Sequence, residues 1–167
     1  MRDIREWRET IEQRAGAVGR RVERLNQVRS LFQSLAIVIP PAAKAWTKRG
    51  MASLRSLAAA LPSETARERV AIHLDGIEAA DKEIGRIEAL LEKIAKSRPA
   101  VKLLQTVPGV GPRLAEAVVA WIDDAKRFKN AKRVGCCAGL TPRPYQSGST
   151  DRTSRISHAG PSRCARC

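Results

Sequence analysis

Residues 63–98 read SETARERVAIHLDGIEAADKEIGRIEALLEKIAKSR and carry a regular helical pattern. The apolar side chains recur with a seven-residue spacing in two rows. The rows are Val70, Ile77, Ile84, Leu91 and His73, Ala80, Ile87, Ile94. This spacing places both rows on one narrow seam of a single helix. Ser63 can cap the helix and Pro99 ends the pattern, so the stretch predicts a coiled-coil helix over residues 63–98.

The segment before it, residues 1–62, carries the same repeat in its first half. One row is Ile4, Ile11, Val18, Leu25 and Phe32. Two long helices with narrow apolar seams are not stable alone in water, because each leaves its seam exposed. We expect them to pair with each other, with copies in another subunit, or both. The simpler alternative is that they are packed helices of one bundle.

The composition favours a helical protein that binds a polyanion. Of 167 residues, 43% are apolar and only 4% aromatic, which suits helix packing better than a β-sandwich. A net charge of +14 points to nucleic acid, with an anionic membrane as the competing partner. No stretch has the length and composition needed to span a bilayer. The N-terminus carries Asp3, Glu6, Glu9 and Glu12 and lacks the apolar stretch of a signal peptide. We therefore expect no membrane partner and a cytoplasmic location with reduced thiols.

The charge divides the chain into three segments. Residues 1–62 hold 12 basic and 5 acidic side chains, residues 63–98 hold 7 and 8, and residues 99–167 hold 12 and 4. A nearly neutral middle therefore separates two basic ends. We interpret these segments as a basic helical linker region, a coiled-coil helix, and a C-terminal domain.

The C-terminal domain opens with LLQTVPGVGPRLAEAVVAWI, residues 103–122, an apolar helical pattern interrupted by a Pro/Gly turn. Helix, hydrophobic-Gly-hydrophobic-Gly turn, helix is the helix-hairpin-helix pattern. Gly109 and Gly111 would let the backbone approach a phosphate, and the N–H groups beside Arg113 would point at its oxygens. A plain turn between two helices is the alternative. The excess of basic side chains over residues 125–167 favours the phosphate-binding interpretation.

Further candidate DNA contacts follow this motif. A basic cluster surrounds Phe128; its members are Lys126, Arg127, Lys129, Lys132 and Arg133. Residues 142–160 are rich in Ser, Thr, Arg, Gly and Pro, and they predict an irregular basic loop that offers Arg143, Arg152 and Arg155. A solvated tail is the alternative interpretation. The fold class we expect is all-α, with long coiled-coil helices followed by a small helical domain that carries the helix-hairpin-helix motif and this loop.

We expect no metal site within the chain itself. Four thiols are present, Cys136, Cys137, Cys164 and Cys167, but an adjacent Cys-Cys pair is poor zinc-ligand spacing. Asp123 and Asp124 are neighbours whose side chains diverge by about 100° on a helix. A solvated or N-capping role suits these two carboxylates better than metal binding.

The ordered motifs of residues 103–160 resemble one family of transposases. They are Gly109 and Gly111, Asp124 with Phe128, the Ala138–Pro142 turn, Gln146-Ser147-Gly148, Ile156-Ser157 and Gly160. This series is similar to the C-terminal domain of insertion-sequence transposases named after elements one-ten, one-sixteen and nine-oh-two. Residues 1–98 resemble the arginine-rich helix and coiled-coil linker that precede this domain, so the resemblance covers nearly the whole chain.

The resemblance implies DNA as partner, a homo-oligomer formed through the coiled coil, and a guide RNA as a further partner. It also implies an N-terminal RNase H-like domain whose acidic residues bind divalent metal (Mg²⁺), and further C-terminal helices. Neither part is recognised in this sequence. We therefore expect a transposase fragment with no cofactor of its own, unable to cut DNA alone.

By the same resemblance, Ser147 is the nucleophile that attacks the DNA phosphodiester in the complete enzyme. A serine hydroxyl needs a base and stabilisation of the phosphorane charge. Chemical rivals are Ser149, Ser154, Ser157 and Tyr145. The alternative function is a non-catalytic helix-hairpin-helix module that binds nucleic acid.

Overall fold

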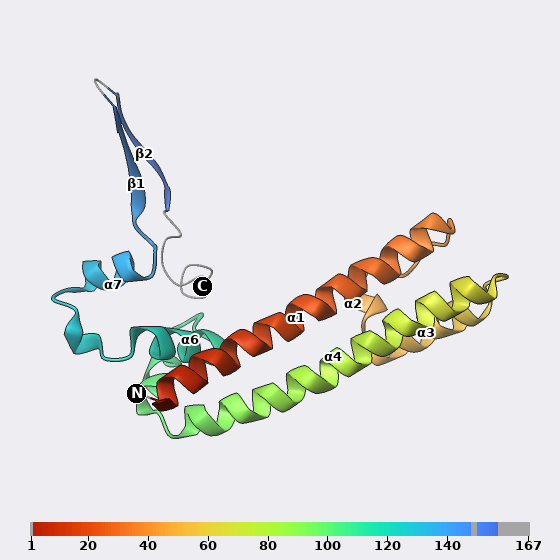
Figure 1. Cartoon of the computed structure of the whole chain (residues 1–167), viewed down its shortest axis with the longest axis horizontal. Coiled ribbons are helices and arrows are strands. Elements are labelled where there is room, and N and C mark those ends of the chain that lie inside the picture. Colours follow the sequence, from red (N-terminus) through yellow and green to blue (C-terminus); the bar gives the residue numbers. More distant parts are fainter. Residues whose placement is uncertain (1, 148–149, 157–167) are drawn as a thin grey trace. The chain divides into compact units, whose positions relative to one another are not determined.

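The structure is a computed structural model that describes residues 2–147 and 150–156, and helices dominate it (Figure 1). The all-α class is confirmed. In chain order the helices are α1 (Arg2–Ser34), α2 (Ala42–Ala45), α3 (Lys48–Ala59), α4 (Glu64–Lys96), α5 (Pro99–Leu104), α6 (Pro112–Ile122), the 3₁₀ turn η1 (Ala125–Arg127) and α7 (Ala131–Cys137). No helix in this described part is both long enough and apolar enough to cross a membrane.

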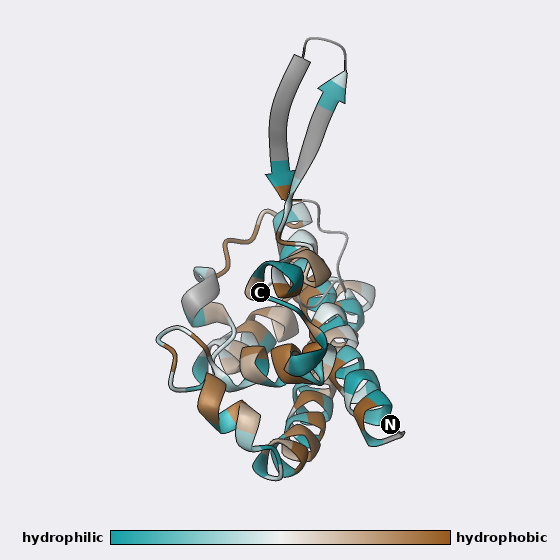
Figure 2. Cartoon of the chain, turned by 90° about the vertical axis from the view of Figure 1, so that its left-hand side faces the viewer, coloured by the Kyte–Doolittle hydropathy of each residue, from teal (hydrophilic) through white to brown (hydrophobic). Residues whose placement is uncertain are grey.

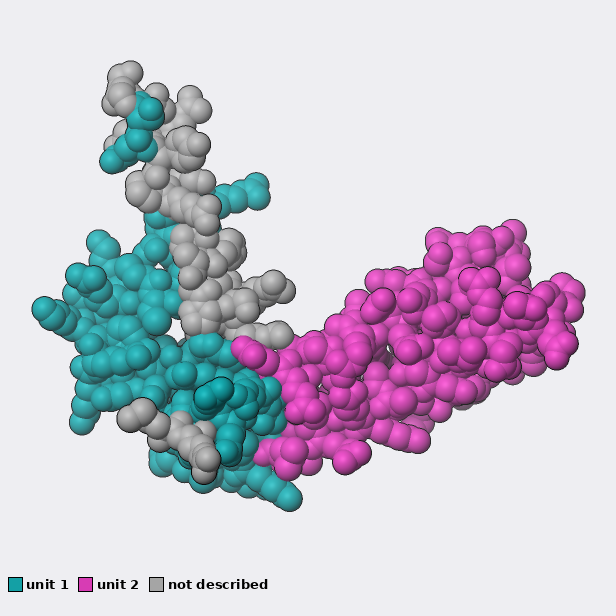
Figure 3. Space-filling view, viewed as in Figure 1, with its two compact units in different colours: residues 1–11, 91–167 teal, residues 12–90 magenta. Residues whose placement is uncertain are grey.

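The chain folds as two compact units, coloured separately in Figure 3. Unit 1 comprises residues 1–11 and 91–167, and unit 2 comprises residues 12–90. The two units do not coincide with the three predicted segments, because α1 and α4 each contribute residues to both units. Whether residues 1–62, 63–98 and 99–167 act as functional domains stays a prediction.

Unit 2 is built on α1, α3 and α4 with the short α2 packed among them. Its buried cluster takes side chains from all four helices and from Leu61 between α3 and α4; the helical members are Val28, Phe32, Ala45, Leu54, Ala58, Val70, Leu74 and Ile77. Figure 2 shows hydrophobic and hydrophilic residues alternating along the helices, as expected for helices with one apolar face. The seam of α4 is therefore covered within the chain, by α1 and α3.

Ion pairs mark the antiparallel register of α1 and α4. Arg14 binds Glu88 at 2.6 Å and Arg21 binds Asp81 at 2.5 Å. A step of seven residues forward on α1 thus matches a step of seven backward on α4. Arg20 also binds Glu83, at 2.6 Å. Arg14 and Arg21, seven residues apart on α1, thus both pair with acidic residues of α4.

The predicted boundaries and most of the predicted seam of α4 are confirmed. Ser63 caps the helix, with its Oγ accepting a hydrogen bond from the Ala66 N–H at 3.3 Å. Val70, Ile77 and Leu91 are buried. At the start of the second row, His73 is half-buried with its Nδ1 3.5 Å from Arg24 Nη1 of α1, whereas its neighbour Leu74 is fully buried. Leu74 belongs to the buried cluster because α3 as well as α1 packs on this part of α4.

The basic segment after α7 differs in part from the irregular loop that we predicted. It forms two antiparallel strands, β1 (Pro142–Ser147) and β2 (Thr150–Ile156), paired from Pro142 with Ile156 to Ser147 with Thr150. The register shifts between Pro142 and Pro144, which is how a strand accommodates prolines that cannot donate to a ladder. Thr, Tyr and Ile in this segment favour a strand. The prediction of an irregular loop gave more weight to its Ser, Arg and Pro residues.

Candidate nucleic-acid interface

The α5–α6 turn has the backbone that its glycines predict. Gly109 adopts φ +86°, a left-handed conformation that glycine reaches without steric cost. The Val110 N–H closes the turn on the Val107 carbonyl at 3.0 Å. A Cβ built at Gly109 or Gly111 would meet no atom within 4 Å, so the space in front of both glycines is open. The identification of this turn as a DNA-binding helix-hairpin-helix stays a prediction.

The start of α6 presents backbone donors at the same turn. Gly111 is the N-cap with an ordinary φ of −76°, and Pro112 occupies the first helical position. No side chain caps the helix, so the N–H groups of Arg113 and Leu114 are not satisfied by a capping oxygen. Unsatisfied N–H groups and the positive end of the helix dipole form a site that favours an anion.

The structure brings together Arg113 and a residue that sequence reasoning missed. Glu116 is 1% exposed, and both of its carboxylate oxygens accept hydrogen bonds from Arg113 Nη1, at 2.8 and 3.1 Å. The sequence shows the i, i+3 spacing of these two helical neighbours. It does not show that Glu116 is buried, because burial depends on tertiary packing. A buried carboxylate is costly unless it is paired, so Glu116 holds the guanidinium of Arg113 in place.

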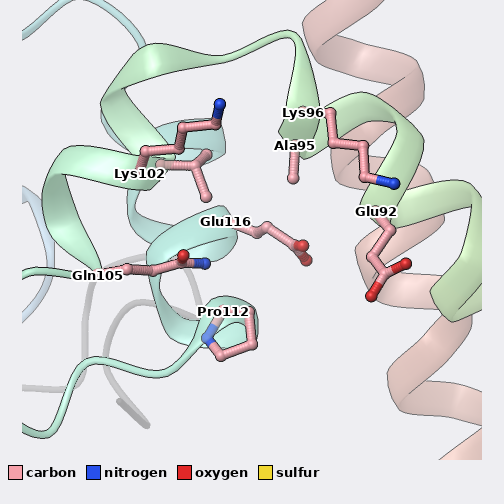
Figure 4. A pocket seen from close by; sticks show the side chains of 8 residues that line it. Glu92, Ala95, Lys96, Lys102, Gln105, Pro112 and Glu116 are labelled. Atoms are coloured by element: carbon pink, nitrogen blue, oxygen red, sulfur yellow. The ribbon is translucent and has the colours of Figure 1, made fainter.

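Glu116 also lines a cavity of about 370 Å³ within unit 1. Residues from α4, α5 and α6 line it: Glu92, Ala95, Lys96, Val101, Lys102, Gln105, Pro112 and Glu116. Figure 4 shows the Glu116 side chain extending from α6 toward the α4 residues of the cavity. The lining carries two carboxylates and two ammonium groups, so it has no strong preference for one sign of charge.

The first turns of α1 complete this part of the molecule. Trp7 is fully buried and Arg98 lies over its ring, with the guanidinium carbon 5.6 Å from the ring centroid. Arg8 Nε donates to the Ala120 carbonyl at 2.7 Å, which places a cation at the C-terminal end of α6. The orientation of α6 therefore depends on residues more than a hundred positions earlier in the chain.

The predicted basic cluster lies on η1, α7 and the loop between them. Its five members, Lys126, Arg127, Lys129, Lys132 and Arg133, are all exposed. Asp124 caps η1 by accepting from the Lys126 N–H at 2.9 Å, as the N-capping interpretation predicted. Asn130 caps α7 in the same way, through the Arg133 N–H at 3.1 Å. These caps fix the backbone that carries the cluster.

The candidate nucleophile lies at the end of β1. Ser147 is exposed and pairs with Thr150 of β2, and Arg155 is exposed near the other end of the hairpin. Arg143 belongs to β1 and Arg152 to β2. Among the described residues, no hydrogen bond or ion pair joins Ser147 to the α5–α6 turn or to the cluster around Phe128. The structure thus keeps Ser147 and the turn as separate features of unit 1.

Several sequence predictions fall outside the described residues. They are the rivals Ser149 and Ser157, the motif residues Gly148 and Gly160, and the thiols Cys164 and Cys167. Within the described ranges, no three His, Cys, Asp or Glu side chains gather in a group that could hold a metal ion. Cys136 and Cys137 are free thiols, the first of them exposed.

Comparison with known proteins bears on the same C-terminal region. Residues 101–166 match the model of the transposase IS116/IS110/IS902 family. The chain is 27% identical over 81% of its length to a transposase for insertion sequence element IS1111A of Coxiella burnetii, covering 37% of that protein. It is 27% identical over 88% of its length to a probable family 20 transposase of Pseudomonas aeruginosa, covering 44% of that protein. A pilin gene-inverting protein of Moraxella lacunata is 39% identical over 35% of the chain, which covers 18% of that protein.

Two of these similarities extend well beyond the matched region, although the chain spans less than half the length of those relatives. The matched residues include the α5–α6 turn, the basic cluster on η1 and α7, and the hairpin that carries Ser147. The fold and the ordered motifs agree with this match. Residues 101–166 thus resemble the IS116/IS110/IS902 family of transposases, as the ordered motifs predicted.

Proposed function

We propose that this chain is a DNA-engaging part of a transposase and acts in DNA transposition. The observation that carries the proposal is the open α5–α6 turn. There the Gly111 N-cap leaves the N–H groups of α6 without a capping side chain. Exposed basic side chains follow it on η1 and α7. Such contacts go to phosphates, so they position DNA without reading its sequence.

Arg113 adds an oriented charge to this site. Its Nη1 is engaged by Glu116, while its Nε and Nη2 groups have no partner among the described residues. A guanidinium fixed in this way offers its remaining N–H donors to a phosphate oxygen at low entropic cost. Arg113 is thus proposed to bind phosphate beside the N–H groups of α6.

Ser147 is the proposed nucleophile on the DNA phosphodiester, with Arg143, Arg152 and Arg155 as phosphate-binding neighbours on the hairpin. Phosphoryl transfer also needs stabilisation of the developing charge. The described residues hold no cluster of metal ligands that fits this role. In the proposal, Mg²⁺ is held by an acidic RNase H-like domain of the complete transposase.

Self-association belongs to the same proposal, but through a different surface from the predicted seam. The seam is covered within the chain, whereas Ile72 and Leu90 are 53% and 52% exposed. These two residues are 18 positions apart on α4, about five helical turns, so they share one face. We propose that this outer face of α4 pairs with a second copy. A guide RNA is a further proposed partner.

The phosphate-binding role of the turn is tested by a matched pair of variants, Gly111→Asn and Gly111→Asp. Both side chains are good N-caps, and the open space at Gly111 accommodates either. Only Asp places a negative charge where the phosphate is proposed to bind. We expect both variants to fold, and we expect Asp to weaken duplex DNA binding on the order of tenfold more than Asn at low salt. Fluorescence anisotropy with labelled duplex measures this difference.

One further measurement completes the test. Binding by the parent chain should weaken steeply as salt rises, by about 0.9 log units per phosphate contact for each tenfold increase. Equal affinities of the Asn and Asp variants for duplex DNA would show that no phosphate binds at the turn.

A separate experiment tests catalysis. The chain joined to the remaining domains of a close relative should exchange DNA strands with Mg²⁺. Ser147→Ala should abolish that exchange while leaving DNA binding intact. A covalent protein–DNA adduct that persists in Ser147→Ala would assign the nucleophile elsewhere, with Tyr145 the next candidate.

A further inference from the structure

Only part of the positive charge of residues 1–62 is left to bind a partner. In the sequence it extends along residues 1–62, with an excess of seven basic side chains. In the structure, three arginines of α1 are neutralised by acidic residues of α4. They are Arg14, Arg20 and Arg21. Much of the charge of α1 within unit 2 is therefore used to hold the helix pair together.

The remaining charge concentrates where α2 meets α3. Residues 25–63 hold five basic side chains and no acidic one. Arg55 is neutralised by two carboxylates of α4, and Arg29 lies over the Trp46 ring. The other three are exposed and have no ion-pair partner among the described residues. We call these three, Lys44, Lys48 and Arg49, the basic corner.

The backbone of the basic corner is fixed by close packing. Thr47 Oγ1 accepts from the Gly50 N–H at 3.1 Å and donates to the Lys44 carbonyl at 2.8 Å. A Cβ at position 50 would lie 2.1 Å from that carbonyl oxygen, so only glycine allows α2 to approach α3 this closely. Side chains on a fixed backbone lose less conformational entropy when they bind a partner.

We propose that the basic corner binds the phosphate backbone of duplex DNA, as a second contact separate from the α5–α6 turn. Beside it lies a cavity of about 450 Å³, lined by Pro40, Lys44, Thr47, Arg49, Gly50 and Ser53. This lining contains ammonium, guanidinium and hydroxyl groups and no carboxylate, which suits phosphate oxygens.

Duplex rather than single-stranded nucleic acid fits this surface. Proteins bind unpaired bases by stacking them on exposed aromatic rings. The nearby aromatic residue, Trp46, is half-buried and has Arg29 over its ring. A duplex shows a regular row of phosphates and needs no stacking platform. The basic corner offers charge alone.

The test compares two double variants of the full chain with the same change of net charge. Lys48→Gln/Arg49→Gln removes charge from the basic corner. Lys82→Gln/Arg86→Gln removes it from exposed positions of α4 among acidic residues. We expect the corner variant to lower the salt slope for duplex binding by about 1.8, and the α4 variant to leave it near the parent value. Equal slopes for the two variants would overturn the proposal.

A footprint on the unmodified protein gives a second readout that does not depend on the variants folding. Duplex DNA at saturating concentration should protect the Lys44 and Lys48 amines from acetylation, detected by mass spectrometry, and leave Lys82 reactive. Unchanged acetylation of Lys44 and Lys48 would contradict the proposal. Protection by single-stranded RNA or by anionic vesicles, but not by duplex DNA, would also contradict it.

The outcome is separable from that of the α5–α6 turn. If the corner variant weakens binding while Gly111→Asp equals Gly111→Asn, the basic corner stands and the role of the turn fails. If the reverse holds, the basic corner fails and the turn stands. A parent chain that does not bind duplex DNA would overturn both.

Discussion

At the scale of single residues, the burial of Glu116 makes its charge important for stability. In the sequence it is one acidic side chain in an apolar helix, and in the structure it is buried under α4 and α5 with Arg113 as its partner. Taking a carboxylate out of water costs several kcal/mol, and a close guanidinium offsets much of that cost. The pair therefore constrains both the fold of unit 1 and the orientation of Arg113.

The first prediction is a strong coupling between these two residues. Arg113→Gln removes the guanidinium that pairs with this buried carboxylate, and we expect a loss of about 2 kcal/mol in the free energy of unfolding. Arg113→Gln/Glu116→Gln removes both charges and should cost less than the two single changes added together. Urea denaturation of the four proteins gives the coupling energy. Additive losses would show that the pair is not coupled.

The second prediction concerns His73, whose pKa is lowered from its usual 6.5. Burial is the main cause, and the charges of Arg24 and Arg69 add to it. Because the folded state binds the proton less readily than the unfolded chain, His73 favours unfolding as the pH falls below about 6.5. The melting temperature of the parent should therefore drop more than that of His73→Gln on acidification. Parallel curves for the two proteins between about pH 7.5 and pH 5.5 would contradict this.

At the scale of helices, the charge pattern specifies register where the apolar pattern does not. Heptad seams allow α1 and α4 to slide by a whole repeat with little change in apolar burial. The pairs Arg14–Glu88 and Arg21–Asp81 are one repeat apart on both helices, so a slip would separate both at once. Each pair is partly exposed and adds little stability, yet together they select one alignment.

The third prediction is a charge swap between α1 and α4. Arg21→Glu places like charges together, and we expect a loss of about 0.5–1 kcal/mol. Arg21→Glu/Asp81→Arg restores an ion pair with reversed sign and should recover most of that loss. Thermal unfolding followed by circular dichroism compares the three proteins. Arg5→Glu, at the exposed i, i+4 pair with Glu9, serves as a control within one helix. If the double variant recovers none of the lost stability, the Arg21–Asp81 pair does not help to set the register of α1 and α4.

At the scale of the molecule, unit 1 depends on both ends of the sequence. The family match begins at residue 101, but Trp7 and Ile11 are buried in unit 1, as are Leu91, Val101 and Ala120. Arg8 also closes the C-terminal end of α6. The region that matches the transposase model is therefore stabilised by residues that lie outside the match.

The fourth prediction is that removing residues 1–11 destabilises α6 more than it destabilises α3. The deletion takes away a buried tryptophan, whose truncation alone costs about 3–5 kcal/mol, together with the cation at the end of α6. Hydrogen exchange read peptide by peptide should show faster exchange over residues 112–122 and little change over residues 48–59. Equal protection of α6 with and without residues 1–11 would show that the region matching the family model folds independently.

The sequence by itself determined the local features of this protein. Helix boundaries near Ser63 and Pro99, the turn at Gly109 and the caps Ser63 and Asp124 follow from the conformations and hydrogen bonds of neighbouring residues. The family resemblance also follows from motif order along the chain. These properties depend on residues a few positions apart, so the sequence contains them directly.

The tertiary structure decided which surfaces meet. It covered the α4 seam within one chain, buried Leu74 ahead of His73, paired Glu116 with Arg113 under α4, and joined the start of α1 to α6. It also left Lys44, Lys48 and Arg49 without carboxylate partners while neutralising Arg14 and Arg21. The physical reason is that a heptad or a charge has many possible partners of equal local fit. Only the simultaneous burial of apolar side chains and pairing of charges across distant segments selects among them.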